Sequence, residues 1–190
     1  MIRRPPRSTP KPSSAASDVY KRQVFGCSPS APTYTAEDFQ CYPDVVYVIR
    51  HAEKQIIKGE KNPELTKRGF SRAEALADSL APLIEGIVYS SEFTRSQQTV
   101  IPLAKKWNVD LKIHRAGDPS GQVAKAVSHC GKSVIIAGHS NTVPGLIKLF
   151  GIKDEVVIED NQYGDLYMIR WENKSPVLSI TFVGDKNSDE

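Results

Sequence analysis

At 190 residues, with 39% hydrophobic and 25% charged residues, the chain has the size and composition of one globular domain. It contains no run of about 18 consecutive apolar residues, so the sequence predicts no membrane-spanning helix. Residues 1–23 hold six of the 25 lysines and arginines but one of the 22 acidic residues, which leaves the rest of the chain with a net charge of −2. The sequence pI of about 8.7 therefore does not indicate a nucleic-acid-binding protein.

The first 23 residues are rich in proline, serine and basic side chains and poor in aliphatic ones. We expect residues 1–23 to be disordered, because such a segment buries too little apolar surface to offset its ordering entropy. Their similarity to translated sequencing-adaptor DNA also indicates a segment that is not native to the protein. Residues 24–43 are predicted to be a linker into a domain over 44–185, which is followed by a short tail at 186–190.

The linker contains a pattern typical of a bacterial lipoprotein. VFGC at 24–27, followed by SPSAPT, places a small residue before Cys27 and a flexible tether after it. On this hypothesis Cys27 is lipidated and tethers the protein to a membrane in the cell envelope or periplasm. An ordinary loop cysteine in a cytoplasmic protein is the alternative.

Short apolar runs alternate with segments of helical periodicity along the predicted domain. The runs are expected to be buried strands and lie at 45–49, 86–90, 109–114 and 133–137. Helices are expected over about 65–84, from Thr94 onward, over about 120–129 and over about 142–150. At the end of the chain, DLYMIRW and VLSITFV flank ENKSP, as in an antiparallel hairpin. These elements predict an α/β fold, a three-layer sandwich with a mainly parallel central sheet, helices on both faces and a C-terminal antiparallel hairpin.

The first two helices carry specific expectations. In the first, Phe70 recurs with alanines and leucines at three-to-four spacing, so we expect Phe70 to face the core and Arg72 to face outward. In the second, Pro102 should bend or end the helix, because proline lacks the amide hydrogen that a helical hydrogen bond needs.

Cys41 and Cys130 each stand just before an apolar run. If those runs are neighbouring parallel strands, both thiols lie at the same edge of the sheet, where a disulfide can form. Two free thiols are the alternative, and the sequence leaves the choice open.

Cationic and imidazole side chains follow three of the predicted strands. Arg50 and His51 end VVYVIRH, Arg95 opens the helix after GIVYSSEFTR, and His139 ends SVIIAGH. Ligands of open parallel sheets bind beyond the carboxyl ends of the strands, so these four side chains are expected to meet at one rim.

These four residues suit a phosphate ligand. Arginine forks match phosphate oxygens, and a neutral imidazole is a competent nucleophile. The lack of H-x-x-x-H spacing and the flanking arginines disfavour zinc. The combination indicates phosphoryl transfer through a phosphohistidine, with no metal and no cofactor.

The motifs VIRHAEK, YSSEFTRSQQT and IAGHSNTVP, in this order, resemble the histidine phosphatase superfamily, also called phosphoglycerate-mutase-like, and its short bacterial phosphatases in particular. The resemblance covers about residues 44–182. It implies that His51 is the nucleophile, that Arg50 and Arg95 clamp the phosphate, and that His139 contacts the transferred phosphoryl group.

Two carboxylates are candidates for the proton donor. Asp118 falls in the stretch where other members of the superfamily carry a catalytic carboxylate, although DPS also suits a helix cap. Glu92 is the second candidate, again with capping as the alternative. A backbone carbonyl is expected to hold the second ring nitrogen of His51.

Further residues are candidates to line the pocket, namely Glu53, Lys54, Glu92, Ser140 and Asn141. Glu53 and Lys54 alternatively form a solvent-facing ion pair. Tyr163, in EDNQYGDLYMI, is expected to pack in the fold, and a position at the border of the site is the alternative.

The sequence therefore predicts a metal-independent phosphomonoester hydrolase, similar to the histidine acid phosphatases, that acts through a phosphohistidine. Its expected partner is a small phosphorylated substrate or a phosphoprotein, and not a nucleic acid; the oligomeric state is not predicted. A catalytically weak module that binds phosphate ligands and a mutase of the same fold are the alternatives. Because 43 residues separate Arg95 from His139, little chain remains for a water-excluding lid, which favours hydrolysis over a mutase.

Overall fold

The computed structural model describes residues 41–82 and 86–185, which lie within one compact unit of the chain, Ala31–Glu190. The predictions for residues 1–23, for the linker up to residue 40 with Cys27, and for the tail at 186–190 fall outside the described residues. Within the described ranges, no helix combines the length and the hydrophobicity that crossing a membrane requires.

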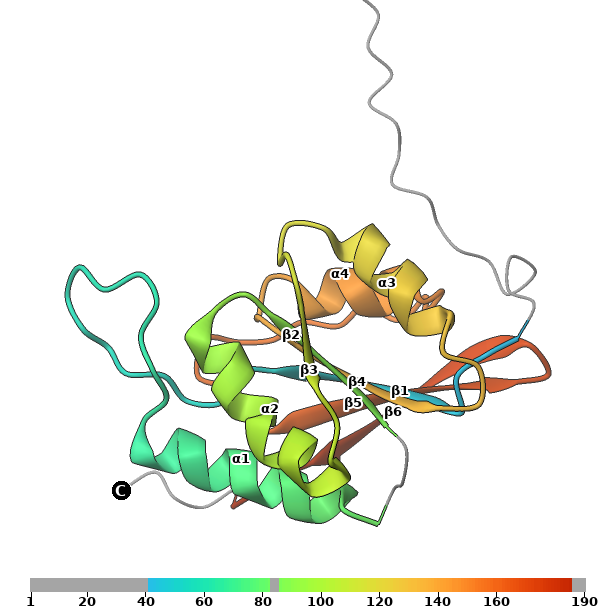
Figure 1. The fold of residues 1–190 in the computed structure, drawn as a ribbon. Helices are drawn as coiled ribbons and strands as arrows, with labels where there is room; N and C mark the ends of the chain where they lie inside the picture. The colour runs from blue at the N-terminus through green and yellow to red at the C-terminus, as the bar shows by residue number, and fades with distance from the viewer. Residues whose placement is uncertain (1–40, 83–85, 186–190) are drawn as a thin grey trace, which may run out of the picture. The chain divides into compact units, whose positions relative to one another are not determined.

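A six-stranded sheet forms the middle layer of this unit (Figure 1). The strands are β1 Val45–Arg50, β2 Ile87–Ser91, β3 Leu111–His114, β4 Ser133–Gly138, β5 Asp165–Glu172 and β6 Ser175–Phe182. They are hydrogen-bonded in the order β3-β2-β4-β1-β5-β6. The first four strands in the chain pair parallel with one another, whereas β5 pairs antiparallel with β1 and with β6. The predicted parallel sheet and C-terminal antiparallel hairpin are both confirmed.

Two helices cover each face of the sheet (Figure 1). The helices are α1 Lys67–Leu80 and α2 Thr94–Trp107 on one face, and α3 Pro119–Val127 and α4 Val143–Leu149 on the other. Val45, Tyr47 and Ile49 of β1 join the core formed with α1 and α2. Val46 and Val48 join the core formed with α3 and α4. Successive side chains of a strand point to opposite faces, so β1 is buried throughout and the three-layer α/β prediction is confirmed.

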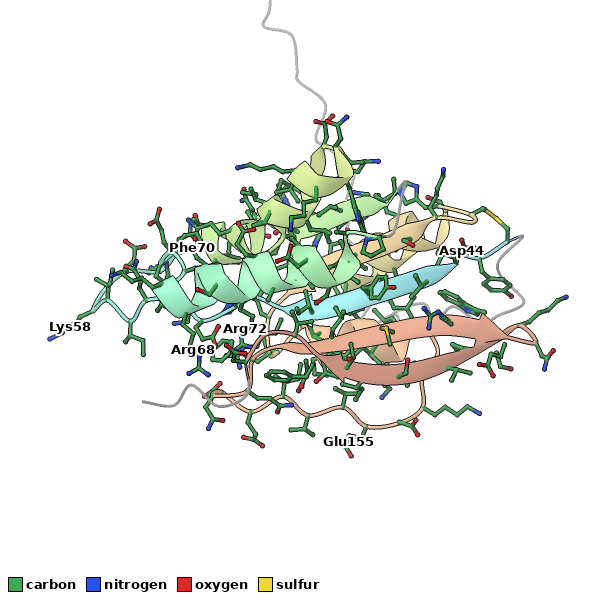
Figure 2. The ribbon with its side chains drawn as sticks, turned by 90° about the horizontal axis from the view of Figure 1, so that it is seen from below. Asp44, Lys58, Arg68, Phe70, Arg72 and Glu155 are labelled. Atoms are coloured by element: carbon green, nitrogen blue, oxygen red, sulfur yellow. A yellow bond between two sulfur atoms is a disulfide. The ribbon has the colours of Figure 1, made fainter. Side chains whose placement is uncertain are left out.

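The orientation of α1 differs from the prediction (Figure 2). Phe70 is 43% exposed, whereas Arg72 is only 5% exposed. The guanidinium of Arg72 donates from Nε and Nη2 to the carboxylate of Glu53 and from Nη1 to the carbonyl of Val183, at 2.6–3.1 Å. These bonds compensate the burial of the charge, so the helix turns an arginine inward where the apolar pattern placed phenylalanine.

Helix α2 does not end at Pro102. It continues to Trp107, since Leu103, Ala104 and Trp107 pack into the core beneath the sheet. The indole Nε1 of Trp107 also donates to the carbonyl of Leu80, which joins the last turn of α2 to α1. Packing of this last turn outweighs the hydrogen bond that proline removes.

Cys41 and Cys130 form a disulfide, with their Cα atoms 5.6 Å apart. They precede β1 and β4, which are parallel neighbours that start in register at Val45 and Ser133. The bridge therefore lies at the amino ends of the strands, as the first alternative for these cysteines predicted.

Reduction of this disulfide should lower the free energy of unfolding by about 2–4 kcal/mol, because the bridge restricts the unfolded chain across a separation of 89 residues. Urea unfolding with and without reductant measures the difference. The double variant C41S/C130S should unfold like the reduced protein and should not respond to reductant. An unchanged midpoint on reduction would contradict a stabilising bridge.

Candidate active site

The carboxyl ends of β1, β4 and β2 meet at one rim of the sheet, because these three strands are parallel neighbours. His51 follows β1, and its amide donates to the carbonyl of Gly138 at the end of β4, at 2.9 Å. The ring of His139, the next residue after β4, lies 5.3 Å from the ring of His51 between centroids. The two rings are 3% and 7% exposed. The predicted convergence of the two histidines is thus confirmed.

A single backbone hydrogen bond fixes the tautomer of His51. Its Nδ1 lies 2.8 Å from the carbonyl oxygen of Ala52, which only accepts, so Nδ1 carries the proton and Nε2 keeps a free lone pair. The Ala52 amide donates in turn to Thr99 Oγ1 at 2.9 Å, and this hydroxyl donates to the carbonyl of Arg95 at 2.7 Å. Thr99 therefore positions both the peptide that orients His51 and the backbone of Arg95. The predicted backbone acceptor exists and is Ala52.

His139 has the opposite tautomer. Its Nδ1 lies 3.4 Å from Nη2 of Arg95, which only donates, so Nδ1 accepts. Its Nε2–H then donates to Ser91 Oγ at 2.9 Å. Ser91, at the end of β2, was not predicted as a site residue. The available signal was a second serine after an apolar strand, on the same rim as the histidines.

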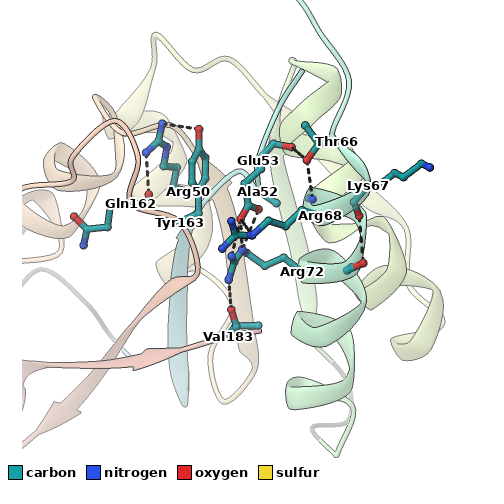
Figure 3. Close-up of polar contacts among 12 residues, drawn as sticks. Arg50, Ala52, Glu53, Thr66, Lys67, Arg68, Arg72, Gln162, Tyr163 and Val183 are labelled. Atoms are coloured by element: carbon teal, nitrogen blue, oxygen red, sulfur yellow. Dashed lines mark hydrogen bonds and ion pairs between the residues drawn. The ribbon is translucent and has the colours of Figure 1, made fainter. Parts of the chain in front are cut away.

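The two arginines approach the histidines from different elements. Arg50 donates from Nη1 to the carbonyls of Glu159 and Gln162 at 2.7 and 2.8 Å (Figure 3). Arg95 comes from the first turn of α2, and its guanidinium lies 4.5 Å from the ring centre of Phe93. The Nε atoms of both arginines are buried and make no hydrogen bond within the described structure. Buried donors of this kind usually have a partner, so the rim is suited to an anion with several acceptor oxygens.

Tyr163 borders the site, as the alternative for this residue predicted, whereas the favoured expectation was packing in the fold (Figure 3). Its ring lies beneath the Arg50 guanidinium at 4.1 Å, and its hydroxyl lies 3.4 Å from Arg50 Nη2. The same ring is 6.2 Å from that of His51 between centroids. Tyr163 also lines an adjoining cavity of about 480 Å³, together with Glu53, Arg68, Arg72, Asn161, Gln162 and Phe182.

Both histidines are neutral near pH 7. Burial lowers the pKa of His51 to about 3; the carbonyl of Ala52 opposes this shift, and the neighbouring cationic groups increase it. Burial, then Arg95, lowers the pKa of His139 to about 4 against the opposing charge of Glu92. Burial also lowers the pKa of Arg95. A neutral imidazole beside fixed cations is the state that nucleophilic attack on a phosphate ester would need.

Of the candidate pocket residues, Glu53 lines the adjoining cavity. It pairs with Arg72 and with Arg68 Nε at 3.2 Å, not with Lys54, so the alternative of a Glu53–Lys54 pair was wrong (Figure 3). Burial alone would raise the pKa of Glu53, but the hydrogen bonds and charge of Arg72 lower it. The backbone of Lys54 pairs with Leu65 in an isolated antiparallel bridge.

Ser140 and Asn141 follow His139 directly in the chain. Ser140 is half-buried, whereas Asn141 is exposed. Their part in lining the pocket stays a prediction.

The candidate proton donors are both exposed and bonded to backbone amides. Asp118 is the N-cap of α3, and its Oδ1 accepts from the amide of Gly121 at 3.0 Å. Glu92 Oε2 accepts from the amide of Ala116 at 2.8 Å. Burial acts to raise the pKa of Glu92, but its backbone hydrogen bonds and the nearby His114 and His139 lower it. These contacts support the capping alternative for Asp118. Glu92 lies near enough to His139 for that histidine to affect its pKa.

The sequence of residues 46–116 matches the histidine phosphatase superfamily, branch 1. This range contains Arg50, His51 and Arg95 but not His139. No curated protein is similar in sequence to this chain at a significant level.

Three solved structures illustrate the likeness of fold. A phosphoserine phosphatase from Entamoeba histolytica, solved with 3-phosphoglyceric acid, is 15% identical with a TM-score of 0.55, over 75% of this chain and 98% of that one. The protein histidine phosphatase SixA, complexed with tungstate, is 15% identical with a TM-score of 0.56, over 73% and 96%. A mycobacterial glucosyl-3-phosphoglycerate phosphatase with inorganic phosphate is 12% identical with a TM-score of 0.53, over 73% and 95%. At these identities the likeness establishes a shared fold.

Replacing Arg95 by methionine should weaken the binding of inorganic phosphate about 10–100-fold, because a hydrogen bond to a charged group is worth roughly 1.5–3 kcal/mol. Isothermal titration calorimetry measures this change. Lys105, an exposed cation in the last turn of the same helix, provides the matched control K105M, whose affinity should stay within about twofold. Equal losses in the two variants would mean that only net charge matters.

Proposed function

We propose that this chain belongs to the histidine phosphatase superfamily, whose model matches residues 46–116, and that it is a metal-independent phosphomonoesterase that works through a phosphohistidine on His51. The observation that carries the proposal is the state of the His51 ring. It is buried and neutral, with Nδ1 held by Ala52 and a free lone pair on Nε2. Arg50 and Arg95 offer buried Nε–H donors without partners in the described structure, as a phosphoryl group requires.

The reaction proceeds in two displacements. His51 Nε2 attacks phosphorus in line, the phosphorus–oxygen ester bond breaks, and the alcohol oxygen leaves with the bonding electrons and takes up a proton from a carboxyl donor or from water. Water then attacks the phosphohistidine and gives up a proton, which replaces the one taken up by the alcohol. The phosphorus–nitrogen bond breaks, and inorganic phosphate and neutral His51 result. Arg50 and Arg95 compensate the charge on the phosphoryl oxygens in both steps, without rearranging as it develops. The neutral His139 orients Arg95 by accepting from its Nη2, while its own Nε2–H donates to Ser91.

Two further observations support hydrolysis of simple esters. The stretch between Arg95 and His139 is taken up by α2, β3 and α3, which leaves little chain there for a lid that would exclude water. Because its pKa is lowered, the carboxyl of Glu92 is ionised near pH 7 and carries no proton to donate, so substrates with good leaving groups are favoured. Asp118 remains the second proposed donor.

Where the protein acts is also a proposal. The disulfide between Cys41 and Cys130 is typical of oxidising compartments and supports a location in the cell envelope, in line with lipidation at Cys27.

His51→Ala should lower kcat for p-nitrophenyl phosphate by at least about 1,000-fold, because the variant has no nucleophile. EDTA should leave the wild-type rate unchanged. His129 bonds to Tyr89 and precedes the amino end of β4, so His129→Ala is the matched control and should retain activity. Turnover that survives in His51→Ala, or that EDTA abolishes, would refute the proposed mechanism.

A further inference from the structure

Residues 55–62 form an arm that leaves the sheet just after the nucleophile. Figure 1 shows it in teal, reaching out beyond the carboxyl end of β1, and Figure 2 shows Lys58 at its tip, at the opposite end of the domain from Asp44. The tip is a turn in which the amide of Glu60 donates to the carbonyl of Ile57 at 3.1 Å. Gly59 has a φ of +83°, which glycine adopts without strain.

The base of the arm is fixed to the site. The amide of Gln55 donates to the carbonyl of Glu64 at 2.8 Å, which closes the arm. Asn62 makes two hydrogen bonds with Thr94, at 2.8 and 2.9 Å, and Thr94 directly precedes Arg95. The arm is therefore held at both the His51 side and the Arg95 side of the phosphate site.

The tip of this fixed arm exposes two neighbouring isoleucines. Ile56 is 95% exposed and Ile57 is 54% exposed. Single exposed apolar residues are common on protein surfaces, but an adjacent pair on an arm anchored beside a catalytic site indicates a contact surface. Neither residue lines the cavity next to Tyr163, so a small phosphomonoester that fills the cavity does not need them.

We propose that the arm 55–62 docks a phosphorylated polypeptide, with Ile56 and Ile57 contacting apolar residues near the phosphorylated side chain. This inference rests on the proposed phosphatase function. Ile56 lies five positions after His51 and hence within about 17 Å of it, a separation that an extended peptide segment can bridge. Because the two isoleucines are exposed and do not line the cavity, a polypeptide reaches them more readily than a small ester bound in the cavity. Lys58 and Lys61 outnumber Glu60 at the tip, so the arm favours a peptide that also carries acidic residues.

An anionic membrane is the less favoured partner. Stable binding to such a surface usually needs a polybasic cluster or a larger apolar face. The tip of the arm offers two lysines, one glutamate and two isoleucines.

The test compares two phosphotyrosine peptides, one with leucine and glutamate and one with glycine and glutamate around the phosphotyrosine, so that they differ only in apolar residues. Aryl esters need little protonation of the leaving group, so their rate of hydrolysis does not depend on which carboxyl donates the proton. A difference in kcat/KM between the two peptides therefore reports docking. Wild-type kcat/KM should be about tenfold higher for the leucine–glutamate peptide, because partial burial of two isoleucines supplies that factor. In I56S/I57S this preference should vanish, while kcat/KM for p-nitrophenyl phosphate stays within about twofold.

Ile180, 56% exposed on β6, supplies the matched control I180S, which should keep the peptide preference. A wild-type protein that does not distinguish the peptides, or an I56S/I57S variant that still does, would overturn the docking role. Binding to phosphatidylglycerol vesicles that only I56S/I57S loses, without any peptide preference, would assign the arm to a membrane instead. Failure of wild type to hydrolyse p-nitrophenyl phosphate would refute the phosphatase function itself.

Discussion

The account depends on one hydrogen bond, from Nδ1 of His51 to the carbonyl of Ala52. A buried imidazole without that acceptor could present either ring nitrogen to a ligand, and only one of the two tautomers is a nucleophile at Nε2. The Ala52 peptide is itself held, because its amide donates to Thr99 on α2. The side chain of Thr99 on α2 therefore holds the peptide that selects the His51 tautomer. Burial then keeps the ring neutral, which preserves the lone pair on Nε2.

Arg50 and Arg72 differ in how many of their guanidinium donors are used within the fold. Arg50 holds the segment 159–163 through two carbonyls and lies over Tyr163, yet its buried Nε makes no hydrogen bond within the described structure. In Arg72, by contrast, all three guanidinium nitrogens donate to Glu53 or Val183. These bonds join α1 to the end of β1 and to the end of β6. The candidate active site and the neighbouring cavity thus share a wall, formed by Tyr163, that contacts with Arg50 fix.

The parts of the site that the sequence predicted are those that follow from strand ends. Arg50, His51 and His139 directly follow or end short apolar runs, and parallel pairing brings such ends together whatever the loops do. Ser91 was missed, and the favoured expectation for Tyr163 was packing, because their roles depend on contacts with residues 48 and 113 positions away in the chain. Phe70 and Arg72 were assigned to the wrong faces for a similar reason, since the burial of an arginine depends on its distant partner Glu53. The cap at Asp118 was recognisable from DPS, because capping is a local interaction.

The most direct test of the central hydrogen bond is nitrogen-15 NMR of the histidine rings across pH, with His51 assigned by its absence in His51→Ala. The account predicts that His51 is the neutral Nδ1–H tautomer at pH 7 and remains unprotonated down to about pH 4, since its pKa is lowered to about 3. An Nε2–H tautomer, or protonation near pH 6.5 as in an unperturbed histidine, would contradict it.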